Sequence, residues 1–166
     1  MTDVVVSMSE RINVNLKWLF VAAAIVFFDQ ITKFAAQSWL YIGEDFSIIP
    51  GLSFTLAYNK GAAFSLFYHD SGWQTIFFIT LALLVSIYLV YYLVHLQHGS
   101  TILKIGISLI LGGAIGNMLD RIWYGHVVDF ILLYYKSFSW PVFNLADTAI
   151  TCGAGMLLID SSRSTR

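Results

Sequence analysis

The segment WQTIFFITLALLVSIYLVYYLV, Trp73 to Val94, contains no charged side chain over 22 residues. An α-helix rises about 1.5 Å per residue, so a helix of this length can cross the hydrocarbon core of a bilayer, which is about 30 Å thick. The rest of the chain has the same character, because 58% of its 166 residues are hydrophobic and only 11% are charged. A soluble domain typically has about 25% charged residues. The sequence therefore predicts an integral membrane protein.

Three further apolar segments complete a predicted single domain of four transmembrane helices. We expect these spans at about residues 16–39, 73–95, 102–122 and 140–160. The first is long enough only if it continues through Asp29 and Lys33, which places both inside the membrane. In the third, Gly112 and Gly116 are one turn apart and would let another helix approach closely. Lys and Arg number five against four in favour of the flanks on the side of the termini, which favours cytoplasmic termini.

Two connecting segments are predicted on the extracytoplasmic side, at about residues 41–70 and 124–140. Polar and apolar residues alternate within Glu44–Phe67, and Pro50-Gly51 is a turn signal, which together indicate β-structure. Segment 124–140 is rich in Tyr and Trp, which favour the lipid headgroup layer, so we expect it to lie at the membrane interface. The predicted fold class is an all-α integral membrane protein with a small β-rich extracytoplasmic piece and an interfacial segment.

Ionisable side chains of different spans fall at a similar depth. Counted by helical rise from the inner end of its span, Asp29 lies about 18 Å along the first helix and Asp120 about 24 Å along the third. Lys33 lies one turn beyond Asp29, and Asp147 lies about 10 Å below the outer end of the fourth span. Asp129 is in the segment just above. Ionisable groups inside a membrane are usually functional, so this agreement in depth predicts one polar site in its outer half.

The immediate neighbours of these groups predict different roles. Asp29 and Lys33 are separated by four residues and can pair, which indicates a structural or orienting role for Asp29. Lys33 is close enough to the predicted surface to extend its amine into the headgroup layer. Asp120 precedes Arg121, whose permanent charge favours the ionised carboxylate, so we expect Asp120 to support the fold.

Asp129 and Asp147 have no cation beside them in the sequence. Two carboxyl groups that share one proton provide an acid and a base, which can activate water and protonate the departing nitrogen of a peptide bond. An aspartic dyad is therefore one hypothesis. A metal site formed by His126 with these two aspartates is another, although no H-E-x-x-H motif occurs. A small proton-coupled transporter and a structural membrane subunit also remain as alternatives.

Five ordered motifs stand out along the chain, and they are DQITK at 29–33, NKGAAF at 59–64, GGAIGNMLDR at 112–121, HVVDF at 126–130 and FNLAD at 143–147. In order and spacing they resemble the motifs of the lipoprotein signal peptidases, the type II signal peptidases of bacteria. The resemblance covers nearly the whole chain and implies a four-span aspartic intramembrane protease of the bacterial inner membrane, with both termini cytoplasmic. It also implies that the β-rich piece is an extracytoplasmic cradle near the active site. We expect no cofactor and no metal.

The resemblance implies a reaction and a set of site residues. The expected reaction is cleavage of diacylglyceryl-modified prolipoproteins just before the lipidated cysteine, with Asp129 and Asp147 as the catalytic pair. The residues implied to support the site or contact substrate are Asp29, Lys33, Asn59, Gly61, Gly112, Asn117, Asp120, Arg121, Asn144 and Ala146. Asn59, Asn144 and Arg121 are alternative donors to the developing oxyanion. Lys60 departs from the family pattern, which often has a small polar residue there.

The expected partners follow from the same reading. They are lipidated prolipoprotein substrates and membrane lipid, and we expect a monomer. A net charge of −1 and the absence of a basic run argue against nucleic acid as a partner.

Overall fold

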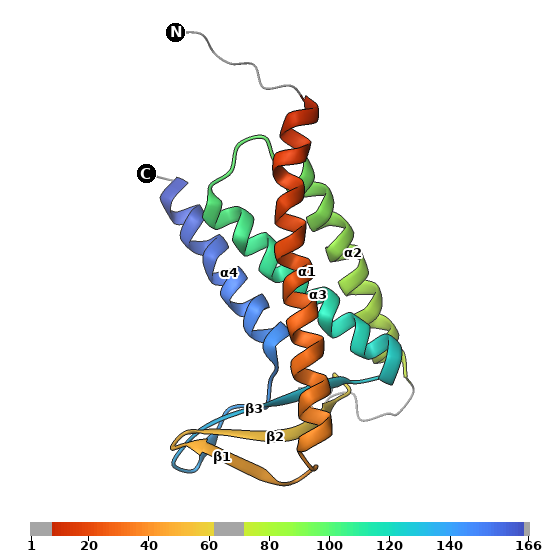
Figure 1. Ribbon diagram of the computed structural model, residues 1–166, viewed down its shortest axis with the longest axis vertical. Coiled ribbons are helices and arrows are strands. Elements are labelled where there is room, and N and C mark those ends of the chain that lie inside the picture. Colours follow the sequence, from red (N-terminus) through yellow and green to blue (C-terminus); the bar gives the residue numbers. More distant parts are fainter. Residues whose placement is uncertain (1–7, 62–71, 165–166) are drawn as a thin grey trace.

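The computed structural model describes residues 8–61 and 72–164. The elements in chain order are α1 (Met8–Trp39), β1 (Asp45–Ile49), β2 (Leu52–Asn59), α2 (Trp73–His95), α3 (Thr101–Tyr124), β3 (Val127–Tyr135), β4 (Phe138–Ser139) and α4 (Leu145–Ser164). The helices run alongside one another, and the sheet lies at the end where α1 finishes and α4 begins (Figure 1). The start of α1 and the end of α4 lie at the opposite end.

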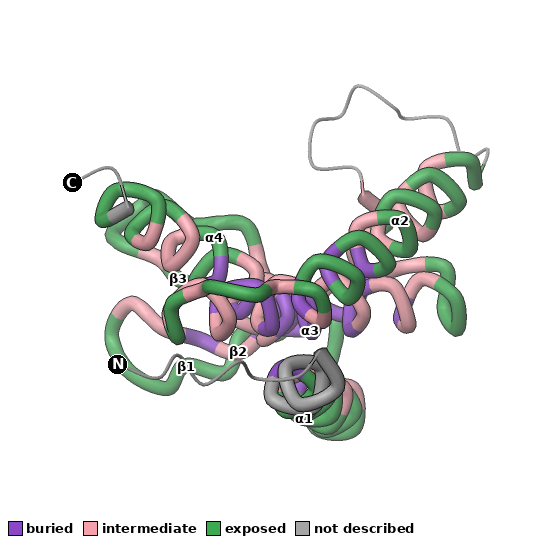
Figure 2. Tube along the Cα trace, turned by 90° about the horizontal axis from the view of Figure 1, so that it is seen from above, coloured by how far each residue is buried: buried purple, intermediate pink, exposed green. Residues whose placement is uncertain are grey.

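Helix α3 occupies the centre of the bundle. Buried residues gather along it between the other three helices (Figure 2). The apolar core packs Ile107 and Leu111 of α3 against Ala22 of α1 and Leu93 of α2. The outward faces carry large exposed apolar side chains, such as Phe20, which is 77% exposed. Because hydrocarbon solvates such a surface better than water does, the outside of the bundle suits lipid.

Three helices of the described residues are long and apolar enough to cross a membrane: Asn15–Trp39, Trp73–His95 and Thr101–Tyr124. Helix α4 is not among them. The predicted start of this helix at residue 140 is wrong, because the helix begins at Leu145. The chain before it is extended, and the backbone N–H of Phe143 donates to the carbonyl of Ile131 in β3 at 3.0 Å. Pairing with the sheet therefore delays the start of α4.

The sheet is antiparallel, with the strand order β1-β2-β3-β4. Strands β1 and β2 lie in the segment Glu44–Phe67, for which alternation predicted β-structure, while its residues 62–67 lie outside the described residues. The aromatic segment 124–140, for which no strand was predicted, supplies β3 and β4. Its alternation is hidden because four consecutive residues, 127–130, are all buried. The pairing places Asp129 of β3 opposite Ala57 of β2.

Glycines of α3 allow the close approach predicted from their spacing. A Cβ on Gly112 would lie 2.7 Å from the carbonyl oxygen of Ala22 in α1, and one on Gly116 would lie 2.5 Å from a carboxylate oxygen of Asp29. A Cβ on Gly113 would collide with the carbonyl oxygen of Ala146 in α4. The backbones of α1 and α4 therefore pack directly against α3.

Replacing Gly113 by Ala is expected to destabilise the protein by about 1–3 kcal/mol, because backbone atoms cannot move aside as a flexible side chain can. Gly155 of α4 is the matched control, since a Cβ there meets nothing within 4 Å. Its replacement by Ala should leave stability unchanged or raise it by about 0.5–1 kcal/mol. Thermal unfolding in detergent measures both variants. Equal melting temperatures for them would contradict the close packing of α3 on α4.

Candidate active site

A polar cluster lies where the sheet meets the helices. Its residues come from five elements and the turn before α4, and most of them are buried in otherwise apolar surroundings. The members are Asp29, Gln30 and Lys33 of α1, Asn59 of β2, Asn117, Asp120 and Arg121 of α3, Asp129 of β3, Asn144 before α4, and Ala146 and Asp147 of its first turn. Apart from Gly61 and Gly112, which lie beside it, the cluster contains every site residue implied by the resemblance.

Asn144 and Asp147 form the start of α4. The side-chain Oδ1 of Asn144 accepts from the backbone N–H of Asp147 at 2.9 Å, and Oδ2 of Asp147 accepts from the backbone N–H of Asn144 at 3.3 Å. This reciprocal pattern is a capping box, which satisfies two backbone donors at a helix start. The depth of Asp147 is therefore set by a helix cap and not, as predicted, by a helix running down from residue 140.

Asn144 also links the two candidate catalytic acids. Its side-chain Nδ2 donates to Oδ1 of Asp129 at 2.7 Å, while its backbone and Oδ1 hold Asp147. The side chain of Asn59 forms a further hydrogen bond with Asp129, and Oδ1 of Asn59 accepts from the backbone N–H of Gly61 at 2.8 Å. Asp129 is only 2% exposed, whereas Asp147 is half-buried. Both acids are thus held by asparagines, and Asp147 is the more accessible.

The environment of Asp129 favours its neutral form. Burial, followed by the nearby charge of Asp147, raises the pKa of Asp129 from 3.8 to about 6. Hydrogen bonds from Asn59 and Asn144 and the charge of Lys33 act in the opposite direction and limit the rise. A carboxyl group with such a pKa exchanges its proton near neutral pH, as an acid–base catalyst requires.

Replacing Asp129 by Asn is expected to raise stability more at pH 7.5 than at pH 4.5. Because the folded-state pKa lies above the unfolded value, protonation of Asp129 stabilises the fold; this contribution is complete below about pH 3.8 and is lost as the pH rises through about 6. The loss is on the order of 3 kcal/mol, and Asn, which does not ionise, avoids it. Melting temperatures at both pH values, with the exposed Asp45→Asn as control, measure the difference. A pH-independent difference would contradict this assignment.

Lys33 is the central cation of the cluster. Its Nζ lies 2.7 Å from Oδ2 of Asp29, 2.8 Å from Oδ2 of Asp120 and 2.9 Å from Oδ1 of Asn117. The prediction that Lys33 reaches the headgroup layer is wrong, since the residue is 2% exposed. An ammonium group has three donors, and these three acceptors use all of them. The pairing of Asp29 with Lys33 is confirmed.

The two carboxylates paired with Lys33 also accept hydrogen bonds from backbone N–H groups of two other segments. Oδ1 of Asp29 accepts from the N–H of Ala146 at 2.9 Å, and Oδ2 of Asp120 accepts from the N–H of Val128 at 3.1 Å. Ala146 and Val128 immediately precede Asp147 and Asp129. The supporting role expected for Asp120 fits these contacts, but its cationic partner is Lys33 and not Arg121.

Asn117 forms hydrogen bonds with both Lys33 and Asp147. Because Oδ1 of Asn117 accepts from Lys33, its Nδ2 must point the other way, and it donates to Oδ1 of Asp147 at 2.8 Å. Nδ2 of Asn144 also donates to Oδ1 of Asn117, at 3.1 Å. The lysine thereby fixes the orientation of an amide that contacts a candidate catalytic acid.

Arg121 faces the acids from another side. Its Nη1 donates to the carbonyl of Asn117 at 3.1 Å, and its guanidinium lies 4.9 Å from the centre of the Phe78 ring. The charges of Asp147, Asp120 and Asp129 all act on it. Phe78 also packs against Gly61, where a Cβ would lie 2.6 Å from the ring. Phe78 of α2 therefore connects Arg121 to the end of β2.

The metal hypothesis gains no support from the geometry. The ring of His126 lies against those of Tyr58 and Tyr124, with centroids 4.4 and 6.0 Å away. Among the described residues there is no group of three or more His, Cys, Asp or Glu side chains placed to hold a metal ion.

Two members of this region were missed by sequence reasoning. Gln30 contacts Asp29 and Asp120, the two carboxylates paired with Lys33. The only sequence feature that could have indicated Gln30 was its position beside Asp29 in DQITK. Phe78 lies in a uniformly apolar span, where one aromatic residue cannot be distinguished from its neighbours by pattern.

Long apolar helices, an apolar outer surface and a buried cluster of acids at one end define an integral membrane protein with a polar site built into it. The family model for signal peptidase (SPase) II matches residues 21–163. The chain belongs to the signal peptidase II family and is therefore a peptidase.

Individual relatives agree with this assignment. The chain is 46% identical over 147 residues to a lipoprotein signal peptidase of Acinetobacter baumannii, covering 89% of this chain and 84% of the relative. It is also 46% identical over 154 residues to that of Pseudomonas aeruginosa, covering 92% and 91%. A solved bacterial membrane enzyme determined by the in meso method at 2.3 Å resolution has a TM-score of 0.78 and 33% identity, covering 90% of this chain and 89% of that one.

Proposed function

We propose that the protein removes signal peptides from diacylglyceryl-modified prolipoproteins by hydrolysing the bond before the lipidated cysteine. The reaction is carried by Asp129 and Asp147. The observation that supports this most directly is that Asn144 contacts both carboxyl groups at the end of a membrane-embedded bundle. The names of the relatives support the substrate class.

In the proposed mechanism the two acids share one proton. In the reactive form this proton is on Asp129, whose pKa is raised to about 6, and Asp147 takes a proton from the attacking water. Asp129 then donates its proton to the departing nitrogen. Water reaches the pair through Asp147, the more exposed member.

Arg121 is the proposed donor to the developing oxyanion. Nδ2 of Asn144 already contacts Asp129, Asn117 and the carbonyl of Val128, and Asn59 contacts Asp129 and Gly61. A guanidinium has five N–H donors, and Arg121 uses one of them for the carbonyl of Asn117. Such a group stabilises negative charge that develops on a carbonyl oxygen.

The proposed topology has four membrane-spanning helices, with α4 as the fourth, and both termini in the cytoplasm. The sheet is then an extracytoplasmic cradle for the substrate near the outer face of the bacterial inner membrane. Exposed aromatic side chains near the sheet support this placement, because Trp and Tyr favour membrane–water interfaces; they are Trp39, Tyr41, Trp73, Trp123, Tyr124, Tyr135 and Trp140. We propose that the enzyme acts as a monomer surrounded by lipid.

Cleavage by the purified protein tests the function. A diacylglyceryl-modified prolipoprotein should yield a product that begins with the lipidated cysteine, as read by mass spectrometry, with and without a chelator. The matched control is the same precursor without the lipid, which should remain intact. No cleavage of the lipidated precursor, together with pH-dependent flux in vesicles, would instead favour the transporter hypothesis.

A further inference from the structure

Gln30 occupies a position that the proposed chemistry leaves unexplained. It projects from α1 toward α3, and its Nε2 lies 2.9 Å from Oδ1 of Asp120, 3.2 Å from the carbonyl of Gly116 and 3.3 Å from Oδ2 of Asp29. An amide nitrogen carries two hydrogens, which these three acceptors share. No contact with Asp129 or Asp147 is present, so any influence on the dyad must pass through other groups.

The two acids that Gln30 contacts hold the backbone immediately before each member of the proposed dyad. Asp29 holds the N–H of the residue before Asp147, and Asp120 holds the N–H of the residue before Asp129. The separation of these two supporting carboxylates therefore controls the separation of the two backbone segments that carry the dyad. Lys33 pulls both carboxylates toward one nitrogen, and Gln30 bridges them beside it.

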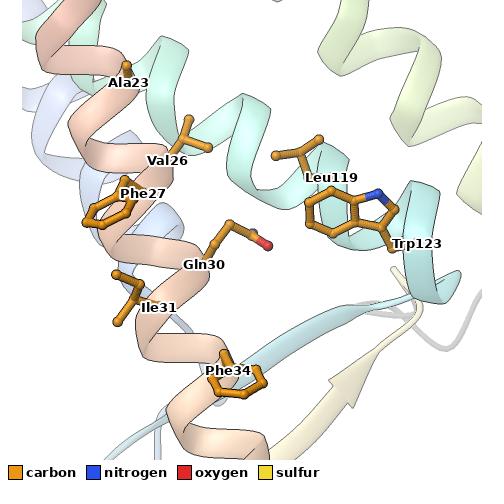
Figure 3. A pocket seen from close by; sticks show the side chains of 8 residues that line it. All are labelled: Ala23, Val26, Phe27, Gln30, Ile31, Phe34, Leu119 and Trp123. Carbon is orange, nitrogen blue, oxygen red and sulfur yellow. The ribbon is translucent and has the colours of Figure 1, made fainter.

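Gln30 also forms part of a groove on the outside of the bundle. The groove lies between α1 and α3, has a volume of about 460 Å³, and is shown in Figure 3. Its other lining side chains are hydrocarbon or aromatic, and they are Ala23, Val26, Phe27, Ile31, Phe34, Leu119 and Trp123. Gln30 thus separates a groove that suits lipid chains from the buried charges of Asp29, Lys33 and Asp120.

We propose that Gln30 is a positioning residue for the peptidase reaction: it fixes the spacing of Asp29 and Asp120, and through them the geometry of Asp129 and Asp147. This inference rests on the proposed dyad. It assigns Gln30 no contact with substrate. Its removal should therefore lower kcat and leave KM unchanged, since the loss appears only where the two acids must act together.

Three variants of Gln30 or its partner test this role with the full-length protein and a lipidated prolipoprotein. Gln30→Leu keeps the groove filled but removes both donors, and it should lower kcat about tenfold with KM within about twofold, because small displacements of reacting groups are costly. Asp120→Asn keeps an acceptor for the N–H of Val128 but removes the charge. If Gln30 acts through Asp120, Gln30→Leu should lower kcat much less in the Asp120→Asn background than in the wild type.

Matched controls separate this role from a general effect on the groove or the fold. Phe27→Leu changes the groove lining without touching the charged residues and should leave kcat unchanged. Melting temperatures identify a variant that fails to fold; in that case Gln30→Met, which is also apolar and fills similar space, replaces Gln30→Leu.

The outcomes distinguish the two proposals. A wild-type kcat for the apolar variant, a loss confined to KM, or losses that multiply in the double variant would each overturn the role of Gln30. If the wild-type protein cleaves and Asp147→Asn does not, the proposed function stands whatever Gln30 does. If the wild-type protein does not cleave, both proposals fail.

Discussion

Protein carrying Asp147→Asn is expected to cleave a lipidated prolipoprotein about 10²–10⁴-fold more slowly than the wild type, the range typical of loss of a general acid or base. The amide oxygen of Asn can still accept from Asn117 or from the N–H of Asn144, so helix α4 should still form. Its NH₂ group then faces the remaining donor, which costs about 1–3 kcal/mol. The initial cleavage rate of the variant should therefore fall by orders of magnitude, whereas its melting temperature should fall only modestly.

The same helix provides the control for this experiment. Asp160 lies toward the other end of α4 and accepts from Oγ of Ser100. Asp160→Asn keeps that acceptor, changes the charge by the same amount and should retain full activity. Turnover by Asp147→Asn at the rate of Asp160→Asn would exclude the dyad.

Lys33→Met is expected to cause the largest loss of stability. It leaves Asp29 and Asp120 buried without their cation, and breaking a buried ion pair in this way costs about 3–5 kcal/mol. The amide of Asn117 loses the contact that orients it toward Asp147, so activity should fall as well. Thermal unfolding and cleavage rate, measured on one preparation, give both effects.

Charge balance gives a second test of the same cluster. In the double variant Lys33→Met with Asp120→Asn, only Asp29 remains of the two carboxylates that pair with Lys33, so stability should recover in part while cleavage stays low. Lys17→Met is the control, because Lys17 is an exposed cation of the same helix. Equal melting temperatures for Lys17→Met and Lys33→Met would show that the ion pairs contribute nothing measurable.

Helical geometry explains which parts of the site could be predicted. The rise per residue is fixed, so counting along α1 and α3 correctly brought Asp29, Lys33 and Asp120 to one level, where they pair. Counting failed for Asp147, because the residues before it pair with β3 and the helix begins later. Its depth depends on a tertiary contact that periodicity does not contain.

The polar contacts beyond the helices were less predictable. The orientation of the Asn117 amide depends on Lys33, which lies 84 residues away in the sequence. Strand β3 was missed because both of its faces are buried at 127–130, so the alternation expected of a half-buried strand is absent. The five motifs nevertheless contain every residue of the cluster, in which the dyad is our proposal.

The capping box of α4 has a consequence for the order in which the enzyme matures. The residues that start the helix also make the contacts of the site: Asn144 caps α4 together with Asp147 and holds Asp129, and the N–H of Ala146 engages Asp29. During synthesis they emerge after α1, α3 and β3, so a partly made chain already inserted in the membrane would lack the assembled form of the proposed dyad. Hydrolysis by the proposed dyad would begin only when α4 docks on α3.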